Sequence, residues 1–127
     1  MSSKIRIDLE FPIHASPSFL YQYISTPDSL GEWFADNVNS RGKQYTFIWD
    51  DSEEVANRLS QKNDVFIRFK WEEDDDDDTY FELRIEVDAL TKDVSLLVVD
   101  FADEDEVEES KMFWENQISE LKHVIGG

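Results

Sequence analysis

The strongest constraint on the fold of this chain is an alternation of apolar and polar side chains that recurs along most of its length. Residues 5–13 carry isoleucine, leucine or phenylalanine at every second position, which is typical of a β-strand with one buried face. The same period recurs in segments 45–49, 55–59, 65–71 and 81–87, and segment 94–101 is apolar on both faces. Turn-forming residues separate these segments, so we predict about six to seven antiparallel strands. The polar positions between the apolar ones, such as Glu82, are expected to face solvent.

Two short helices are expected between the first strand and the rest of the sheet. Ser16 and Pro17 form an N-cap followed by proline at the first helical position, and apolar residues follow at helical spacing. Thr26 and Pro27 repeat this signal within the segment TPDSLGEWF, so one helix ends there and another begins. The second helix has one apolar face, made by Leu30, Trp33 and Phe34. Burial of these side chains keeps so short a helix docked.

A longer helix is expected at the C-terminal end of the chain. Acidic residues 103–106 suit the positive end of its dipole, and Gly126 and Gly127 suit its end. Its apolar stripe consists of Val107, Trp114, Ile118, Leu121 and Ile125. A sheet with one apolar face needs a cover, and this stripe matches it. The predicted fold class is α+β: a curved antiparallel sheet wrapped around the C-terminal helix, in a single domain over residues 1–127.

This order of elements resembles the helix-grip fold of the START-like superfamily. Thr26, Pro27, Leu30 and Trp33 match the superfamily's pattern of a break followed by a short helix that ends near a tryptophan. The final helix, which carries Trp114, also resembles that of the superfamily. The likeness is closest to the branch related to the activator of the heat-shock chaperone ATPase. It spans almost the whole chain and implies a single START-like domain, but its motifs are structural and none is catalytic.

The charge of the chain limits its partners. Thirty acidic and 12 basic residues give a formal net charge of −18, a field that repels phosphate groups. We therefore expect neither nucleic-acid binding nor membrane insertion, and the longest apolar run, 96–99, is too short to span a bilayer. A basic protein partner is compatible with this charge. The absence of cysteine and the lack of a signal-peptide pattern predict a cytoplasmic location.

The sequence contains no recognisable catalytic or metal-binding motif. His14 and His123 are far apart in the chain and fit capping or surface positions. Segment 74–78 is a run of aspartates, for which a loose Ca²⁺ site is one interpretation. It lacks the glycine and the spaced ligands of an EF-hand, so a solvated hairpin loop is the favoured interpretation. We expect no catalytic residue, no metal and no cofactor.

The tryptophans offer the clearest functional interpretation. All four fall on predicted inward faces, where they either fill a core or line a cavity between the sheet and the last helix. The predicted cavity lining is Trp33, Phe34, Tyr45, Trp49, Asn57, Phe69, Trp71, Phe81, Trp114 and Ile118. Tyr45 and Asn57 are its polar members, and each either orients a ligand or bonds to neighbouring backbone.

Two classes of function follow from these observations. The leading hypothesis, which the START-like resemblance implies, is a non-catalytic module that holds an apolar or amphipathic small molecule in this cavity. The alternative is a protein-interaction module that acts as a chaperone adaptor or binds a basic partner. An enclosed cavity of roughly 300–1,000 Å³ would favour the first. A filled core beside an exposed apolar patch would favour the second. An enzymatic function has the least support.

Overall fold

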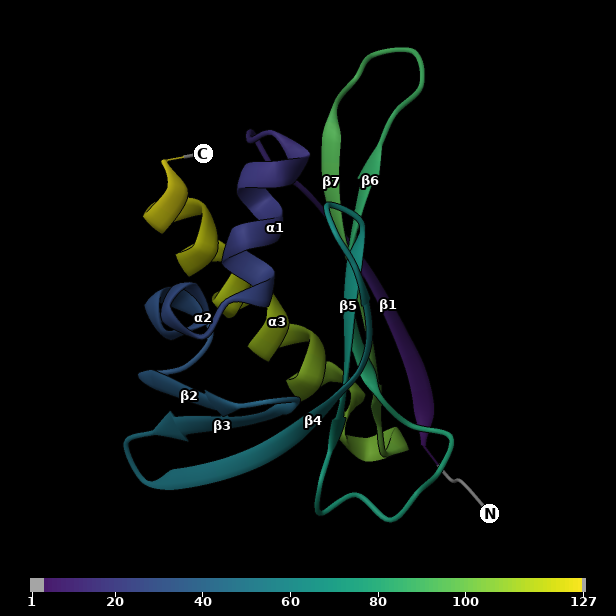
Figure 1. The fold of residues 1–127 in the computed structure, drawn as a ribbon. Helices are drawn as coiled ribbons and strands as arrows, with labels where there is room; N and C mark the ends of the chain where they lie inside the picture. The colour runs from purple at the N-terminus through teal and green to yellow at the C-terminus, as the bar shows by residue number, and fades with distance from the viewer. Residues whose placement is uncertain (1–3, 127) are drawn as a thin grey trace.

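The computed structural model describes residues 4–126 and contains an antiparallel sheet of seven strands (Figure 1). The strands are β1 (Ile5–Pro12), β2 (Asn37–Arg41), β3 (Gln44–Trp49), β4 (Ser52–Lys62), β5 (Phe66–Trp71), β6 (Phe81–Val87) and β7 (Val94–Ala102). Their order across the sheet is β1-β7-β6-β5-β4-β3-β2, so each strand from β2 to β6 pairs with the next along the chain, and β7 also pairs with β1. The predicted antiparallel sheet is confirmed, and β2 is the strand that the sequence pattern did not delimit.

Three α-helices accompany this sheet, and their ends follow the predicted signals. Helices α1 (Pro17–Ser25) and α2 (Pro27–Trp33) follow β1, and α3 (Val107–Ile125) follows β7 after a 3-10 turn at Glu104–Glu106. The Ser16 side chain accepts a hydrogen bond from the Phe19 N–H, and the Thr26 side chain accepts one from the Ser29 N–H, each at 3.3 Å. Gly126 ends α3 with a φ of 77°, which favours glycine; the other predicted end residue, Gly127, lies outside the described residues.

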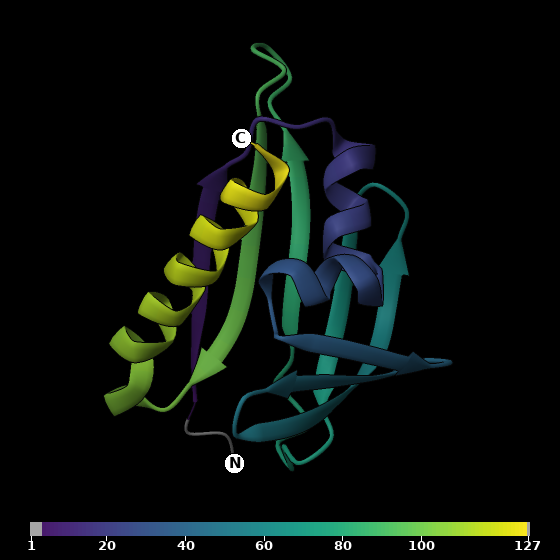
Figure 2. The same cartoon turned by 90° about the vertical axis from the view of Figure 1, so that its left-hand side faces the viewer.

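All three helices lie on one face of the sheet. In Figure 2, α3 crosses in front of β1 and β7, while α1 and α2 lie in front of the neighbouring strands. Strands β2, β3 and β4 curve toward the helices, so the sheet wraps around the helical layer (Figure 1). We call the face toward the helices the concave face and the opposite one the convex face. The α+β helix-grip architecture predicted from the sequence is confirmed.

One acidic side chain of the convex face is buried, which the alternation in β6 did not predict. Glu82 was expected to face solvent, but it is only 4% exposed. Its carboxylate accepts hydrogen bonds from Nε and Nη2 of Arg68 at 2.9 and 2.7 Å, and from Nε of Arg84 at 3.1 Å. The two guanidinium groups also lie over the rings of Tyr80 and Phe66. The expectation fails because Arg84 on the same strand and Arg68 on the adjacent strand β5 cover the carboxylate.

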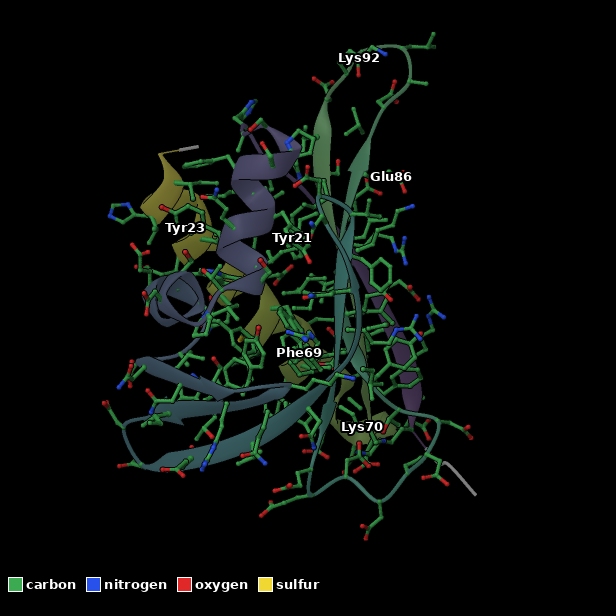
Figure 3. All side chains as sticks on the ribbon, viewed as in Figure 1. Tyr21, Tyr23, Phe69, Lys70, Glu86 and Lys92 are labelled. Carbon is green, nitrogen blue, oxygen red and sulfur yellow. The ribbon has the colours of Figure 1, made fainter. Side chains whose placement is uncertain are left out.

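The acidic segment 74–78 lies in the connection between β5 and β6, as predicted, but Asp74 is tied to its surroundings. Its carboxylate accepts hydrogen bonds from the Thr79 hydroxyl and, at 3.0 Å, from the Asp76 N–H. It also forms ion pairs with Lys4 at 3.4 Å and with Lys70 at 4.0 Å; Lys70 is labelled beside this connection in Figure 3. Burial by itself raises the pKa of Asp74, but these hydrogen bonds and charges outweigh it and lower the pKa below 3.8. A solvated loop therefore does not describe Asp74.

We expect Asp74→Ala to lower the free energy of unfolding by about 1–2 kcal/mol at neutral pH, because it removes a hydrogen-bonded, charge-paired acceptor. A variant with serine at Asp75, Asp77 and Asp78, which are exposed, should change it by less than about 0.5 kcal/mol. Because the folded pKa of Asp74 is lowered, its contribution is present above pH 3.8 and is lost as the pH falls through the folded pKa. Urea denaturation at neutral and acid pH measures both effects. Equal losses from the two variants, or a loss from Asp74→Ala that persists at acid pH, would contradict this assignment.

Candidate functional site

Aromatic rings fill the centre of the space between α3 and the concave face. The ring centroid of Phe34 lies 5.1 Å from that of Phe47, 5.9 Å from that of Phe81 and 5.5 Å from that of Trp114. Phe69 stacks on Phe81 at 5.0 Å, and Figure 3 shows Phe69 among the side chains between the sheet and the helices. Each of these side chains is at most 2% exposed. Rings packed at these distances form a core at this position, with no room left for a ligand between them.

The predicted cavity lining therefore divides into core residues and residues at the edge of the core. The core residues are Tyr45, Phe69, Phe81, Trp114 and Ile118. The Tyr45 hydroxyl donates a hydrogen bond to the carbonyl oxygen of Ser25 at 2.8 Å, so its polar group is satisfied by backbone. Trp33 and Phe34 also belong to the core, and they border a surface cleft beside α2 as well. Trp49 and Trp71 are only half-buried, at the ends of β3 and β5.

Asn57 does not face this core. It pairs with Gln44 on β3 and with Lys70 on β5, and directly paired residues of antiparallel strands share a face. Its neighbour Ala56 is fully buried opposite Trp71 and takes the inward position. The prediction that Asn57 points inward is therefore wrong, because Ala56 and not Asn57 faces the core, so the alternation of segment 55–59 has the opposite phase.

A cleft of about 520 Å³ opens where the concave face ends beside the first turns of α3. We call it the rim cleft, and its lining residues are Trp49, Ser52, Glu54, Trp71, Asp100, Glu106, Ser110 and Phe113. Its aromatic walls come from three elements, since Trp49 ends β3, Trp71 ends β5 and Phe113 lies on α3. The Trp71 ring lies 4.9 Å from that of Phe81, so the wall of the cleft continues into the core.

The charged lining of the rim cleft is acidic. Glu54, Asp100 and Glu106 contribute carboxylates, and the lining residues, all within the described part of the chain, include no lysine, arginine or histidine. A hydrogen bond with Asp103 raises the pKa of Glu106 above 4.5, and the negative charges of nearby acids raise it further. The cleft therefore combines aromatic walls with carboxylates that the lining itself does not neutralise.

Asp100 is the most constrained of these carboxylates. Its Oδ2 accepts a hydrogen bond from Nε1 of Trp114 at 2.8 Å, and its Oδ1 accepts one from the Phe101 N–H at 2.8 Å. Burial is the largest influence on Asp100 and raises its pKa above 3.8. The two hydrogen bonds, the positive charge of Lys4 and a further hydrogen bond with Ser110 act in the opposite direction. This carboxylate is thus held in place by hydrogen bonds below the cleft, but nearby positive charge does not fully offset the cost of burying its ionised form.

A second hollow of about 490 Å³, which we call the side cleft, lies between α2 and α3 and shares Trp49 and Phe113 with the rim cleft. Its wall is fixed at the carbonyl oxygen of Phe34, which accepts hydrogen bonds from Nε1 of Trp49 at 3.1 Å and from Nε2 of Gln117. These bonds join the end of α2 to β3 and to α3. The two clefts therefore adjoin at Trp49 and Phe113. Hydrogen bonds to the Phe34 carbonyl oxygen hold Trp49 and the neighbouring part of α3 in place.

Sequence reasoning missed six residues of the rim cleft: Ser52, Glu54, Asp100, Glu106, Ser110 and Phe113. Phe113 is 40% exposed and lies outside the predicted helical stripe. Its position next to Trp114 is the one feature of the sequence that could have marked it as a site residue. Glu54 and Glu106 carry no signal in a chain so rich in acids. Asp100 carried one, because it is the single charged residue in segment 94–101, which is otherwise apolar on both faces.

The arrangement around the clefts is suited to binding. Aromatic walls supply apolar contact area, and the carboxylates supply charge. Among residues 4–126, no group of three or more histidine, aspartate or glutamate side chains is placed to hold a metal ion. Within the same range, none of the helices has the length and apolar character needed to cross a membrane.

The chain is similar to known proteins along its whole length. The family model described as START-like superfamily domain matches residues 1–127. Among solved structures, BfR322 from Bacteroides fragilis is 33% identical, with a TM-score of 0.66, and the match covers 98% of this chain and 93% of that one. No curated protein matches the sequence.

Two further structures share the fold at lower identity. The Aha1 dimer from Colwellia psychrerythraea is 15% identical with a TM-score of 0.78, and the match covers 93% of each chain. EF2215 from Enterococcus faecalis, described as a conserved protein of unknown function, is 19% identical with a TM-score of 0.73, and the match covers 98% of this chain and 73% of that one. At these identities the likeness shows the fold alone.

Proposed function

Because the chain belongs to the START-like superfamily, we propose that it is a non-catalytic binding module that holds an apolar or amphipathic small molecule in the rim cleft. The observation that carries this proposal is the half-buried pair Trp49 and Trp71, which together with Phe113 lines a cleft of about 520 Å³. Small-molecule sites have volumes of roughly 300–1,000 Å³. Packed rings fill the centre of the space between the sheet and α3, where the sequence led us to expect an enclosed cavity. The proposal therefore rests on the open rim cleft at the end of that space.

The aromatic walls support binding because they are exposed and yet held in place. A ligand that covers Trp49, Trp71 and Phe113 removes apolar surface from water, which stabilises the complex. Trp49 is fixed by its hydrogen bond to the Phe34 carbonyl oxygen, and Trp71 is fixed by its packing against Phe81. Walls that are already ordered lose little conformational entropy when a ligand binds.

We assign no chemical step to this cleft. Two serines, Ser52 and Ser110, line the cleft, and Ser110 is the one close enough to influence Asp100. A serine nucleophile needs a base that is free to take its proton. Both carboxylate oxygens of Asp100 already accept other hydrogen bonds, from the Trp114 indole and from the Phe101 N–H. Asp100 is therefore placed as an acceptor that organises the wall of the cleft.

Titration with a neutral, environment-sensitive dye such as N-phenylnaphthylamine tests this function. We expect dye fluorescence to rise and tryptophan emission to fall, because Trp49 and Trp71 line the site. Phe113→Ala should weaken binding by about tenfold, which corresponds to the loss of about 1.4 kcal/mol of contact. The matched control is Met112→Ala, because Met112 is 62% exposed on the same helix and lines neither cleft. Equal weakening by both variants, or an absence of quenching, would remove the support for a ligand site.

One observation favours the alternative, a protein-interaction module. Met112 and Phe113 are adjacent apolar side chains that are both exposed, and exposed apolar surface often marks a protein contact. The same variants separate the two functions. A partner protein that covers this part of α3 would contact both side chains, so both substitutions would weaken its binding. A small molecule in the rim cleft is sensitive to Phe113 alone.

A further inference from the structure

We propose that the ligand of the rim cleft is a small organic cation, a protonated amine or a guanidinium group joined to an apolar body. The carboxylates of Glu54, Asp100 and Glu106 attract the cationic group of this ligand. The rings of Trp49 and Trp71 contact its apolar body and the part of the cationic group next to that body. This inference rests on the proposed function of the cleft and specifies the chemistry of its ligand.

The first support is a contrast between Asp100 and two other shielded acids of the protein, Glu82 and Asp74; Glu54 and Glu106 are exposed beside Asp100. On the convex face, Glu82 is paired with two arginines, and in the β5–β6 connection Asp74 is paired with two lysines. Among residues 4–126, no ion pair within 4.0 Å involves Glu54, Asp100 or Glu106. The fold thus pairs Glu82 and Asp74 with its own cations. By contrast, Glu54 and Glu106 face solution, and Asp100 feels the charge of Lys4 without an ion pair to any described residue within 4.0 Å.

Asp100 is a partly buried charge that such a cation would stabilise. Burial raises its pKa, so its ionised form lacks compensating charge in the folded protein. Lys4 supplies part of that charge, but its ion pair at 3.4 Å is with Asp74, and Lys4 does not line the rim cleft. Attraction between opposite charges strengthens as the local dielectric constant falls, so a cation near Asp100 would be held more firmly than one at the open surface.

The second support is the aromatic lining. Cations are attracted to the faces of aromatic rings, and tryptophan attracts them best. The chain already contains two contacts of this kind on its convex face, where the guanidinium carbon of Arg68 lies 4.1 Å from the ring centroid of Tyr80 and that of Arg84 lies 4.5 Å from Phe66. Two tryptophans beside three carboxylates offer an external cation both kinds of interaction at one place.

Three probes that share a naphthyl ring separate charge from apolar contact. Naphthylmethylamine is cationic at neutral pH, naphthylmethanol is neutral and naphthoic acid is anionic. Isothermal titration calorimetry gives their affinities, and quenching of tryptophan emission reports whether they reach the cleft. We expect the amine to bind at least about tenfold more tightly than the alcohol, and the acid to bind more weakly than both. The advantage of the amine should shrink as the salt concentration rises.

The net charge of −18 attracts any cation, so the variants are matched in charge. Glu54→Gln with Glu106→Gln removes two carboxylates of the cleft, whereas Glu53→Gln with Glu104→Gln removes two exposed neighbours that do not line it. We expect the first double variant to lose most of the advantage of the amine while its affinity for the alcohol stays within about twofold. The second should leave both affinities within about twofold of the unaltered protein.

Each outcome has one interpretation. If the alcohol binds and quenches tryptophan emission but the two double variants affect the amine equally, the cation proposal is overturned and the binding-module function stands. If none of the three probes binds the unaltered protein, both are overturned. If a lysine-containing peptide with blocked termini binds and the naphthyl probes do not, the ligand is a protein segment, and the small-molecule proposal is overturned in favour of an interaction module.

Discussion

Replacing Trp114 with alanine is expected to lower the free energy of unfolding by about 3–5 kcal/mol, the range for removal of a large buried aromatic side chain. Trp114 is 2% exposed, and its ring lies 5.5 Å from that of Phe34 and 6.1 Å from that of Phe81. These rings belong to different elements, so they can close the resulting hole only in part. Urea denaturation measures the loss, and a value below about 1 kcal/mol would contradict the central place of Trp114 in the core.

Trp114→Phe separates the hydrogen bond from the ring. Phenylalanine keeps most of the apolar contact but has no donor for Oδ2 of Asp100, so we expect a loss of about 1–3 kcal/mol.

The pH dependence of this loss has a definite sign. Burial raises the folded pKa of Asp100 above 3.8, so this group favours folding below pH 3.8 and loses that contribution as the pH rises through the folded pKa. The indole N–H of Trp114 bonds more strongly to the ionised carboxylate than to the protonated one. The loss from Trp114→Phe should therefore be larger at neutral pH than at acid pH. A loss of equal size at both would contradict the assigned role of Asp100 as an ionised acceptor.

The helices were predictable because their signals are local. The hydroxyl groups of Ser16 and Thr26 cap α1 and α2 as the sequence indicated, since a cap and its partner are three residues apart. Leu30, Trp33 and Phe34 are each at most 3% exposed, as their shared helical face predicted. The capping residue and proline of TPDSLGEWF thus mark the junction of two helices, and the two aromatic residues at its end bury that junction against the sheet.

The faces of the sheet were less predictable where a strand is polar on both sides. In β4, either Ala56 or Asn57 could take the inward position, and neither residue type is a strong marker of burial. The position is decided by the partners on β5, Trp71 for Ala56 and Lys70 for Asn57. A register shift between Arg58 and Ser60 also changes the phase within the strand. In β2, Val38 is the one buried residue, so the strand exists largely through its backbone pairing with β3.

The position of the candidate site depends on packing that no local pattern encodes. Phe69 and Trp71 occupy alternate positions of the same strand, and both were predicted to face inward. Phe69 meets the ring of Phe81 and is fully buried, whereas Trp71 ends β5 beside the first turns of α3 and remains half-buried. Sequence therefore predicted which side chains turn toward the helix, but the distinction between filling the core and lining a cleft arises only in three dimensions.

Phe34→Ala should have an effect as large as that of Trp114→Ala, about 3–5 kcal/mol, because Phe34 joins α2 to both the sheet and α3. Its ring lies within 6.1 Å of the rings of Trp33, Phe47, Trp49, Phe81, Phe113 and Trp114. The matched control is Phe19→Ala on α1, because Phe19 is 41% exposed. We expect the control to lose less than about 1 kcal/mol in the same urea denaturation, and equal losses would contradict this central role of Phe34.

Phe34 and Trp114 should also be coupled energetically. Their rings stack at 5.5 Å, so either single substitution already removes the contact between them, and the double variant should lose less than the sum of the single losses. We expect a coupling of about 0.5–1.5 kcal/mol, the range for an aromatic pair. Additivity within about 0.3 kcal/mol would show that the two rings stabilise the protein independently. Phe113, in the wall of the rim cleft, packs 6.1 Å from Phe34 and 5.6 Å from Trp114. If Phe34 and Trp114 are coupled, the cluster that holds α3 on the sheet therefore also supports the wall of the cleft.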